Sequence, residues 1–473
     1  MAGPALSAPP LRKERWYQIV WRWHFYAGLF TIPFVLWLSA TGAIYLFRPQ
    51  IENMLDRPYE KVASGPDRLQ PSEIAAKAQA AVPGSVLHHY ILPASPTQAH
   101  QIVVGQGAEE TRVYVNPANG EVLKQIGEQD RFMRVIFHLH GELLAGRFGS
   151  MLIELAACWT IIMLITGLFL WWPRGARRLA GTLYPRLRKG RRIFWRDIHA
   201  VTGIWISVGA LLLIMSGLPW AQNWGSYFRE IRTLTGTASV KQDWSSGSES
   251  DARERAQLDR QLRQKPHSAG AAASGGIHAE HNMAPAAASF TLKPLDRLIP
   301  AAHDLALPAP VQITPPKDGG NRWRIVSNTY NRPERVTVEI DGGTGAIIGT
   351  EPFSSRHWID QTVGYGVALH EGAFFGLLNQ LINLAILIGL MLLSVSGVIM
   401  WWRRRPEEGL GAPPATGHVP HVWALVGATL ALAFLMPLFG ISLALVTLFE
   451  SITVKRSRRA ARFLGLRGTK QSG

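Results

Sequence analysis

The feature that most constrains this chain is a set of long apolar runs that contain no Asp, Glu, Lys or Arg. These runs cover residues 23–47, 155–172, 198–228, 372–402 and 409–449. About 20 apolar residues suffice to cross the hydrocarbon core of a bilayer, so the first four runs predict transmembrane helices. Tryptophans stand at their ends, as at Trp171, Trp172, Trp401 and Trp402, which is typical of the aromatic belt at a membrane interface. The sequence therefore predicts a polytopic α-helical membrane protein.

The distribution of charge gives the orientation of these helices. The chain carries a net charge of +16, although only 17% of its residues are charged, against about 25% in soluble proteins. Nine Arg or Lys and no acid lie in residues 174–196. By the positive-inside rule this loop is cytoplasmic, and the long segments 48–150 and 221–371 lie outside. The excess charge then reports topology, and a nucleic-acid partner is not expected.

The cysteine content and the two terminal apolar runs further limit the class of membrane protein that this chain can be. Cys158 is the single cysteine, which excludes disulfide frameworks, thiolate iron–sulfur clusters and c-type haem attachment. The first apolar run is longer than the core of a signal peptide and no cleavage site follows it, so we interpret it as a retained anchor. Residues 421–449 form either a fifth span or a re-entrant segment bent at Pro437 and Gly440. The side on which the C-terminus lies stays open.

Two spacings recur and indicate an internal duplication of a helix, loop, helix unit. In the first and third helices a histidine precedes a glycine by 18 residues, and before the second and fourth helices a histidine precedes a glycine by 27. The pairs are His24 with Gly42, His199 with Gly217, His140 with Gly167, and His370 with Gly397.

The two outside segments show the same order of elements. Each has a short helix, three strand-like runs and a glycine-containing turn, which predicts two small extracytoplasmic α+β domains. The helices are expected at 71–82 and 294–306, the strands at 86–92, 101–104, 112–115, 310–314, 322–327 and 335–340, and the turns at 116–120 and 341–345. Residues 244–290, rich in Ser, Ala and Gly, are expected to form a flexible insertion in the second domain.

These observations divide the chain into eleven segments. We expect a cytoplasmic N-terminus at 1–22, spans at 23–47 and 197–221, outside domains at 48–130 and 222–360, interfacial helices with spans at 131–172 and 361–402, cytoplasmic loops at 173–196 and 403–420, the fifth span or re-entrant segment at 421–449, and a basic tail at 450–473.

Four histidines in two layers form the candidate redox site. His24 and His199 are expected near the cytoplasmic helix ends, and His140 and His370 at the outer surface, because a helix rises about 1.5 Å per residue. Ionisable residues at membrane depth usually face the bundle interior for a reason. Paired imidazoles are the axial ligands that a b-type haem requires, so the sequence predicts two haems.

Other residues are weaker candidates for the same site. Small residues such as Gly28, Gly42, Gly203 and Gly217 would let a flat macrocycle approach the helix backbone. His138 is either a spare ligand or a structural residue. Arg22, Arg174 and Arg196 either pair with haem propionates or mark the cytoplasmic boundary. Glu154 is an interfacial residue or a proton-handling group, and each histidine alone could be purely structural.

The combined pattern resembles the PepSY-associated transmembrane proteins over about residues 15–450. The resemblance rests on the His-x-x-x-Gly helix starts, on Trp-Trp-Pro-Arg at 171–174 and Trp-Trp-Arg-Arg at 401–404, and on the two hairpin turns. It implies a bacterial inner-membrane protein with PepSY-like periplasmic domains. Some members of this family are di-haem reductases that release iron from ferric siderophores, so the resemblance also implies this activity. It further implies that the haem ligands are His24, His140, His199 and His370. The 244–290 insertion departs from the pattern.

The resulting hypothesis is a di-haem oxidoreductase that takes electrons from a quinol or a cytoplasmic reductase and reduces ferric siderophore iron in the periplasm. No nucleotide-binding fingerprint is found, so the donor is expected to be another molecule. Two alternatives remain. One is a b-type cytochrome that relays electrons to a periplasmic redox protein, and the other is a non-enzymatic PepSY-domain protein that binds or regulates a partner.

Overall fold

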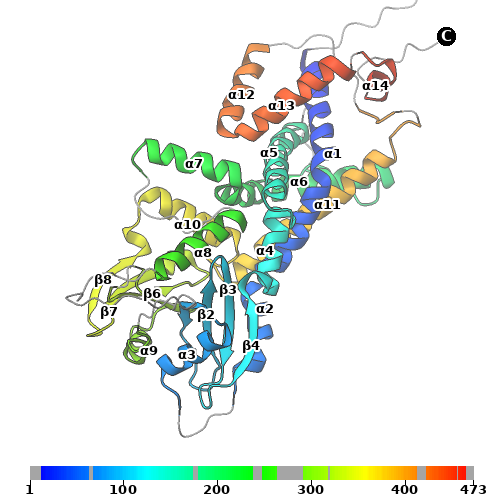
Figure 1. The fold of residues 1–473 in the computed structure, drawn as a ribbon. Coiled ribbons are helices and arrows are strands. Elements are labelled where there is room, and N and C mark those ends of the chain that lie inside the picture. The colour runs from blue at the N-terminus through cyan, green and yellow to red at the C-terminus, as the bar shows by residue number, and fades with distance from the viewer. Residues whose placement is uncertain are drawn as a thin grey trace, which may run out of the picture. The chain divides into compact units, whose positions relative to one another are not determined.

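The computed structural model describes residues 12–62, 68–173, 179–237, 248–263, 291–317, 320–407, 409–412, 422–454 and 456–464. They belong to two compact units (Figure 1). The helical unit takes Met1–Leu46, Leu139–Gly236 and Leu377–Gly473, and the sheet unit takes Phe47–His138 and Thr237–Gly376.

Four long apolar helices form the helical unit. They are α1 (Arg12–Leu46), α5 (Gly146–Trp171), α6 (Arg191–Gly217) and α11 (Leu377–Trp402). All four are long and apolar enough to cross a membrane, and each coincides with one of the four predicted spans. Both α1 and α6 pack against α5 and α11, so α1 and α6 lie diagonally across the bundle. The helices α1 and α6 begin earlier than the apolar runs, because a membrane boundary does not end a helix.

Short helices complete this unit. They are η3 (Leu218–Trp220), α7 (Gln222–Leu234), α12 (Val422–Leu435), α13 (Pro437–Phe449), η6 (Glu450–Val454) and α14 (Arg458–Phe463). The predicted bend in 421–449 falls at Met436, between α12 and α13, which meet at an angle in Figure 1. Each of the two helices is about 20 Å long, which is too short to cross a bilayer alone.

The chain beyond α13 returns to the end of the bundle where α1 begins. The Leu464 carbonyl accepts hydrogen bonds from Tyr26 Oη (2.6 Å) and Arg22 Nη2 (3.2 Å). The Phe463 carbonyl accepts one from the Leu410 amide (2.9 Å). Phe463 and Leu464, in the basic tail, therefore lie at the same end of the helical unit as the basic start of α1. Whether 421–449 spans the membrane or re-enters it stays a prediction.

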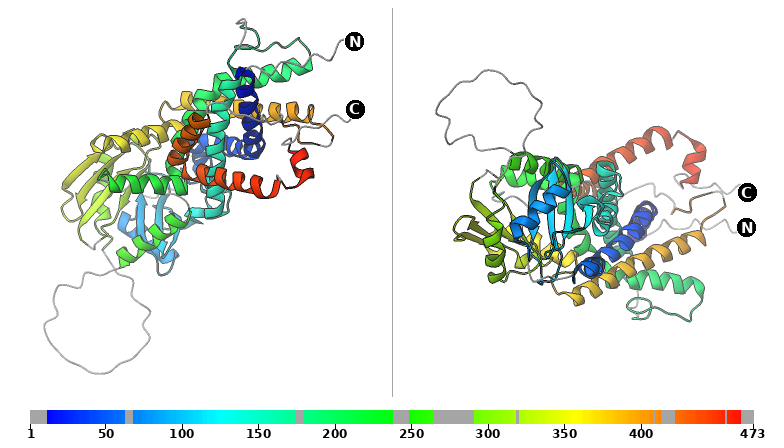
Figure 2. Two further views of the ribbon diagram at one scale, coloured as in Figure 1. Left: turned by 90° about the horizontal axis from the view of Figure 1, so that it is seen from above. Right: turned by 60° about the horizontal axis from the view of Figure 1, so that its bottom comes forward.

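The sheet unit holds one eight-stranded antiparallel sheet in the order β4-β3-β2-β1-β5-β6-β7-β8. Figure 2 shows the strands of the earlier segment, in blue to cyan, beside those of the later segment, in green to yellow. Its strands are β1 (Val86–Ile91), β2 (His100–Gln106), β3 (Glu109–Val115), β4 (Val122–Gly127), β5 (Val311–Thr314), β6 (Arg322–Ser327), β7 (Val336–Asp341) and β8 (Ile347–Pro352). The expected pair of separate small domains is thus wrong. The two segments share one sheet because β1 pairs with β5, which leaves neither strand as an unpaired edge.

One face of the sheet carries the apolar core under α3 (Pro71–Ala81) and α9 (Leu295–Asp304). The expected turns at 116–120 and 341–345 connect β3 to β4 and β7 to β8. Gly120 (φ 74°) and Gly345 (φ 78°) supply the left-handed backbone that each turn needs. The two outermost strands, β4 and β8, were not predicted, because they lack buried side chains and hence an apolar alternation.

The other face of the sheet is polar at β2 and β3, and short helices complete the sheet unit. These are α2 (Arg48–Asp56), η1 (Arg57–Tyr59), η2 (Glu128–Asp130), α8 (Ser248–Arg263), η4 (Arg332–Glu334), η5 (Phe353–Ser355) and α10 (Trp358–His370), while α4 (Phe132–Glu142) links this unit to the helical one. The helix α8 corrects the expectation of flexibility for part of the insertion, and residues 264–290 lie outside the described chain. It folds because its Leu262 is buried and because Arg255 and Arg263 donate to the Ala108 and Gly84 carbonyls, both at 2.7 Å.

A histidine beneath α8 occupies the space that a side chain at Gly105 would need. His88 is fully buried, donates from Nδ1 to Glu110 (2.7 Å), and lies where a Cβ at Gly105 would overlap its ring. We expect Gly105→Ala to destabilise the sheet unit by about 1–3 kcal/mol through overpacking. Hydrogen exchange of the β1 and β2 amides measures this. Gly349→Ala in β8, where a Cβ meets nothing, is the matched control, and equal effects would contradict the overlap.

Candidate metal centre

His24 and His199 meet inside the helical bundle. His24 lies on α1 and His199 on α6, the two diagonal helices, so their side chains approach across the bundle interior. Their ring centroids are 6.3 Å apart and the ring planes are nearly perpendicular, at 85°. The two histidines that were predicted for one layer are therefore neighbours in the fold.

The neighbouring helix α5 fixes the orientation of His24. The Nδ1 atom of His24 lies 3.0 Å from the Met163 carbonyl oxygen and 3.1 Å from Thr166 Oγ1. A carbonyl can only accept, so Nδ1 carries the hydrogen and Nε2 is the nitrogen that can bind a metal. The next residue, Gly167, leaves room for the ring, since a Cβ there would stand 3.1 Å from His24 Cε1.

The helix α11 holds His199 in the same way. The Nδ1 atom of His199 lies 3.1 Å from the Leu393 carbonyl oxygen and 3.1 Å from Ser396 Oγ. Gly397 follows the serine, and a Cβ there would lie 3.6 Å from His199 Cε1. Both imidazoles thus present the same tautomer, and each is fixed by a carbonyl and a hydroxyl three residues later on the adjacent helix.

This geometry fits an iron atom between two imidazoles. Two bonds of about 2 Å from metal to imidazole nitrogen, with each ring centre roughly 1 Å farther out, separate the ring centres by roughly 6 Å. Within the described residues no group of three or more His, Cys, Asp or Glu could hold a metal ion. A centre with only two protein ligands suits a haem, whose porphyrin supplies the other four nitrogens.

His140 contacts a hydroxyl residue and an adjacent glycine in a similar way, near the opposite end of α1. Its Nδ1 lies 2.9 Å from Thr41 Oγ1, and a Cβ at Gly42 would stand 3.2 Å from its Cε1. Thr41 is 17 residues beyond His24, which is roughly 26 Å along the helix. His370 ends α10 in the sheet unit, so its predicted pairing with His140 stays a prediction.

Three of the glycines that were expected to admit a macrocycle lie against side chains of this unit, and that expectation stays a prediction. Gly42 makes room for the His140 ring. A Cβ at Gly28 would meet Met163 Sδ at 3.8 Å, and one at Gly203 would meet a methyl group of Leu393 at 3.7 Å. These two positions therefore face side chains of the adjacent helices.

The remaining predicted residues have partners within the protein. His138 Nε2 bonds Gln129 Oε1 (2.9 Å). Arg22 bonds the Leu464 carbonyl, as described above. Arg196 pairs with the fully buried Asp197 (2.6 Å), which also binds Arg186, so the Asp197 carboxylate organises the basic loop. Arg174 lies outside the described residues.

Glu154 caps a helix of the same unit. Its carboxylate accepts hydrogen bonds from the amide nitrogen (2.9 Å) and Nδ2 (3.2 Å) of Asn223, in the first turn of α7. A carboxylate is favoured at a helix N-terminus, where backbone amides have no partner within the helix. This contact accounts for a buried acid in a membrane-length helix without a role in proton transfer.

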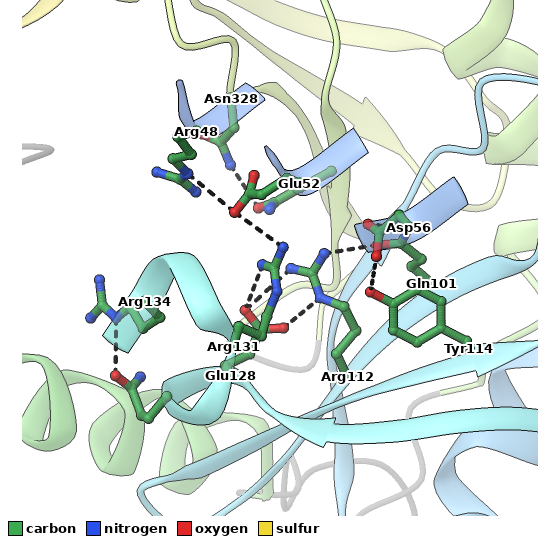
Figure 3. A network of polar contacts seen from close by, with 12 residues as sticks. Arg48, Glu52, Asp56, Gln101, Arg112, Tyr114, Glu128, Arg131, Arg134 and Asn328 are labelled. Carbon is green, nitrogen blue, oxygen red and sulfur yellow. Dashed lines mark hydrogen bonds and ion pairs between the residues drawn. The ribbon is translucent and has the colours of Figure 1, made fainter. Parts of the chain in front are cut away.

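A second polar cluster lies in the sheet unit, on the polar face of β2 and β3 (Figure 3). Arg112 donates from Nε and Nη2 to Glu128 and from Nη1 to Gln101 Oε1 (2.8 Å). Arg131 joins Glu128 (3.4 Å) to Glu52 (3.3 Å). Glu52 in turn binds Arg48 (3.2 Å) and the Tyr330 hydroxyl. The cluster therefore connects α2 to both halves of the sheet.

Ion pairing outweighs burial in this cluster. Burial alone would raise the pKa of Glu128, but Arg112 and Arg131 hold that pKa below its usual value. The pKa of Glu52 is lowered in the same way, against its burial, by Arg48 and Arg131. Both carboxylates are therefore ionised and paired at neutral pH. Sequence reasoning did not single out these residues, although an arginine inside a strand, such as Arg112, is an informative signal.

Comparison with known proteins supports the class of the fold. The model of the PepSY-associated TM region matches residues 21–404, which include α1 from Trp21 onward, the other three membrane-length helices and the whole sheet. A search of curated proteins found no match. The match covers most of the chain. The chain therefore belongs to the PepSY-associated transmembrane family.

Proposed function

We propose that this protein is a di-haem b-type cytochrome of the bacterial inner membrane that reduces ferric siderophore iron in the periplasm. The observation that carries the proposal is the matched anchoring of His24 and His199 by α5 and α11. Structural histidines have no need for facing rings, a shared tautomer and equivalent partners. In both rings Nδ1 is occupied by hydrogen bonds, so Nε2 of each stays free for one metal, because ring orientation and tautomer decide which nitrogen binds.

Each pair of histidines would hold one haem. His24 and His199 would ligate the inner haem, and His140 and His370 the outer haem, as the repeat spacings suggest. A haem between two imidazoles supplies reversible one-electron transfer. The two layers would put an electron carrier near each membrane surface. The matching strand orders β1 to β4 and β5 to β8 support an internal duplication as the origin of the two layers.

The charge distribution supports the direction of transfer. Arg22, Arg403 and Arg404 flank the end of the bundle that holds His24, and basic residues favour the cytoplasmic side. Electrons would enter there from a quinol or a cytoplasmic reductase, and the sheet unit would lie in the periplasm. One electron converts bound Fe(III) to Fe(II), which hard oxygen ligands hold less tightly, so the siderophore releases it.

Absorption spectroscopy of the purified protein tests this function. We expect a dithionite-reduced spectrum with the α-band of b-type haem and two haems per chain. We also expect stopped-flow mixing of the reduced protein with a ferric hydroxamate siderophore to oxidise the haems and to yield Fe(II), trapped by ferrozine. A spectrum without haem would contradict the proposed function and favour the hypothesis of a non-enzymatic binding protein. Haem that ferric siderophores do not oxidise would favour a relay to a periplasmic redox protein.

A further inference from the structure

We infer that Thr166, Ser396 and Thr41 are positioning residues that set the reduction potentials of the haems through Nδ1 of the ligand histidines. This inference deepens the proposed function and rests on it. Each of the three hydroxyl oxygens lies 2.9–3.1 Å from an imidazole Nδ1, and each residue is followed directly by a glycine at which a Cβ would lie 3.1–3.6 Å from Cε1 of that imidazole.

The carbonyl acceptor beside each hydroxyl indicates which way these bonds run. Thr166 Oγ1 donates to the Ile162 carbonyl (2.7 Å), and Thr41 Oγ1 donates to the Trp37 carbonyl (2.8 Å), each four residues earlier in its own helix. Ser396 Oγ donates to the Leu393 carbonyl (3.0 Å). With the hydrogen used in this way, each oxygen presents a lone pair and accepts the Nδ1 hydrogen of its histidine.

A helix gains nothing from these pairs by themselves. A glycine within a helix costs roughly 0.5–1 kcal/mol relative to alanine, and a hydroxyl that bonds back to its own helix is slightly destabilising. The same unfavourable pair, a hydroxyl residue followed by glycine, nevertheless lies beside His24 and His199 in one layer and beside His140 in the other. Ser216 and Gly217 form a fourth such pair on α6, where the serine donates to the Leu212 carbonyl (2.7 Å).

The physical effect acts on the iron through the imidazole. An acceptor at Nδ1–H makes the ring more electron-rich and a stronger ligand for Fe(III) than for Fe(II), which lowers the reduction potential. His24 has two acceptors, the Met163 carbonyl and Thr166. Removal of the hydroxyl leaves the carbonyl in place, so the haem should stay bound while its potential rises.

Thr166→Val in the full-length protein tests this inference by redox potentiometry. Loss of one hydrogen bond should favour reduction of one haem by up to about tenfold, which is about 59 mV for a one-electron couple. The haem content should stay at two per chain. Thr166→Ser keeps the hydroxyl and should leave both potentials unchanged. Thr160→Val is the matched control, because Thr160 is buried on the same helix and bonds only its own helix, at the Ala156 carbonyl.

Two further variants assign the effect to a layer. Ser396→Ala should raise the reduction potential of the same haem as Thr166→Val, since His199 faces His24. Thr41→Val should raise the reduction potential of the other haem. If one variant folds poorly, the reduction potentials of the other variants still test the inference. Unchanged potentials and electron paramagnetic resonance g-values in all three, with two haems bound, would overturn the inference and leave the proposed function intact. Absence of haem from the wild-type protein would instead remove the proposed function and this inference together.

Discussion

His24→Ala should lower the haem content from two per chain to one, and His199→Ala should remove the same haem. The reason is that the two imidazoles face each other with centroids 6.3 Å apart, so they would bind opposite faces of a single iron. The double variant should therefore still retain one haem. Pyridine haemochrome assay and the reduced-minus-oxidised spectrum of each purified variant measure the content and show which haem is lost.

The control for this experiment is His303→Ala. His303 is an exposed histidine in the last turn of α9 in the sheet unit, and its replacement should leave both haems in place. Added imidazole should restore the missing haem in His24→Ala by filling the space of the deleted ring. Two haems in each single variant would contradict the pairing. So would the loss of different haems from the two variants, with none left in the double variant.

The spacing of the histidines was sufficient to predict that His24 and His199 lie at one level, because depth in a membrane helix follows from residue count. The level shared by His140 and His370 stays a prediction. His24 and His199 were expected at one level and are found facing each other. Their partners could not be predicted in the same way. Which carbonyl accepts from Nδ1 depends on how α1 packs against α5, and the repeated Thr166 and Ser396 were visible in the sequence without a reason attached to them.

The sheet shows a different limit. Six of its strands were predicted, because buried β-branched and aromatic residues mark them. The pairing of β1 with β5 was not predicted. Tyr90 and Ile313 are more than 200 residues apart, and no local sequence pattern indicates that they are neighbours. The helix α8 was expected to be a flexible segment, because its composition is polar and Leu262 and Asp259, which are buried, do not form an apolar pattern.

Arg112→Met should destabilise the sheet unit by about 3–5 kcal/mol, because it leaves a buried carboxylate with one of its two arginines missing. Arg112 is almost fully buried and makes hydrogen bonds to both Glu128 and Gln101. Methionine fills most of the volume, so the loss is chiefly electrostatic. Hydrogen exchange of the Val113 and Val115 amides in β3 reports the free energy of opening of this unit within the intact protein.

Arg322→Met supplies the comparison, since Arg322 pairs with Glu339 at 3.2 Å on the surface of the same sheet. An exposed pair contributes about 0–1 kcal/mol, so this variant should differ little from the wild type, and a similar cost for both variants would contradict the role of the cluster.

Acid distinguishes the electrostatic loss at Arg112 from a packing defect. The folded-state pKa of Glu128 lies below its unfolded value, so its ionised form stabilises the fold above the unfolded pKa, and this contribution is lost as the pH falls through the folded pKa. The difference in stability between wild type and Arg112→Met should therefore narrow on acidification. A packing defect would keep the difference constant, because a cavity does not titrate.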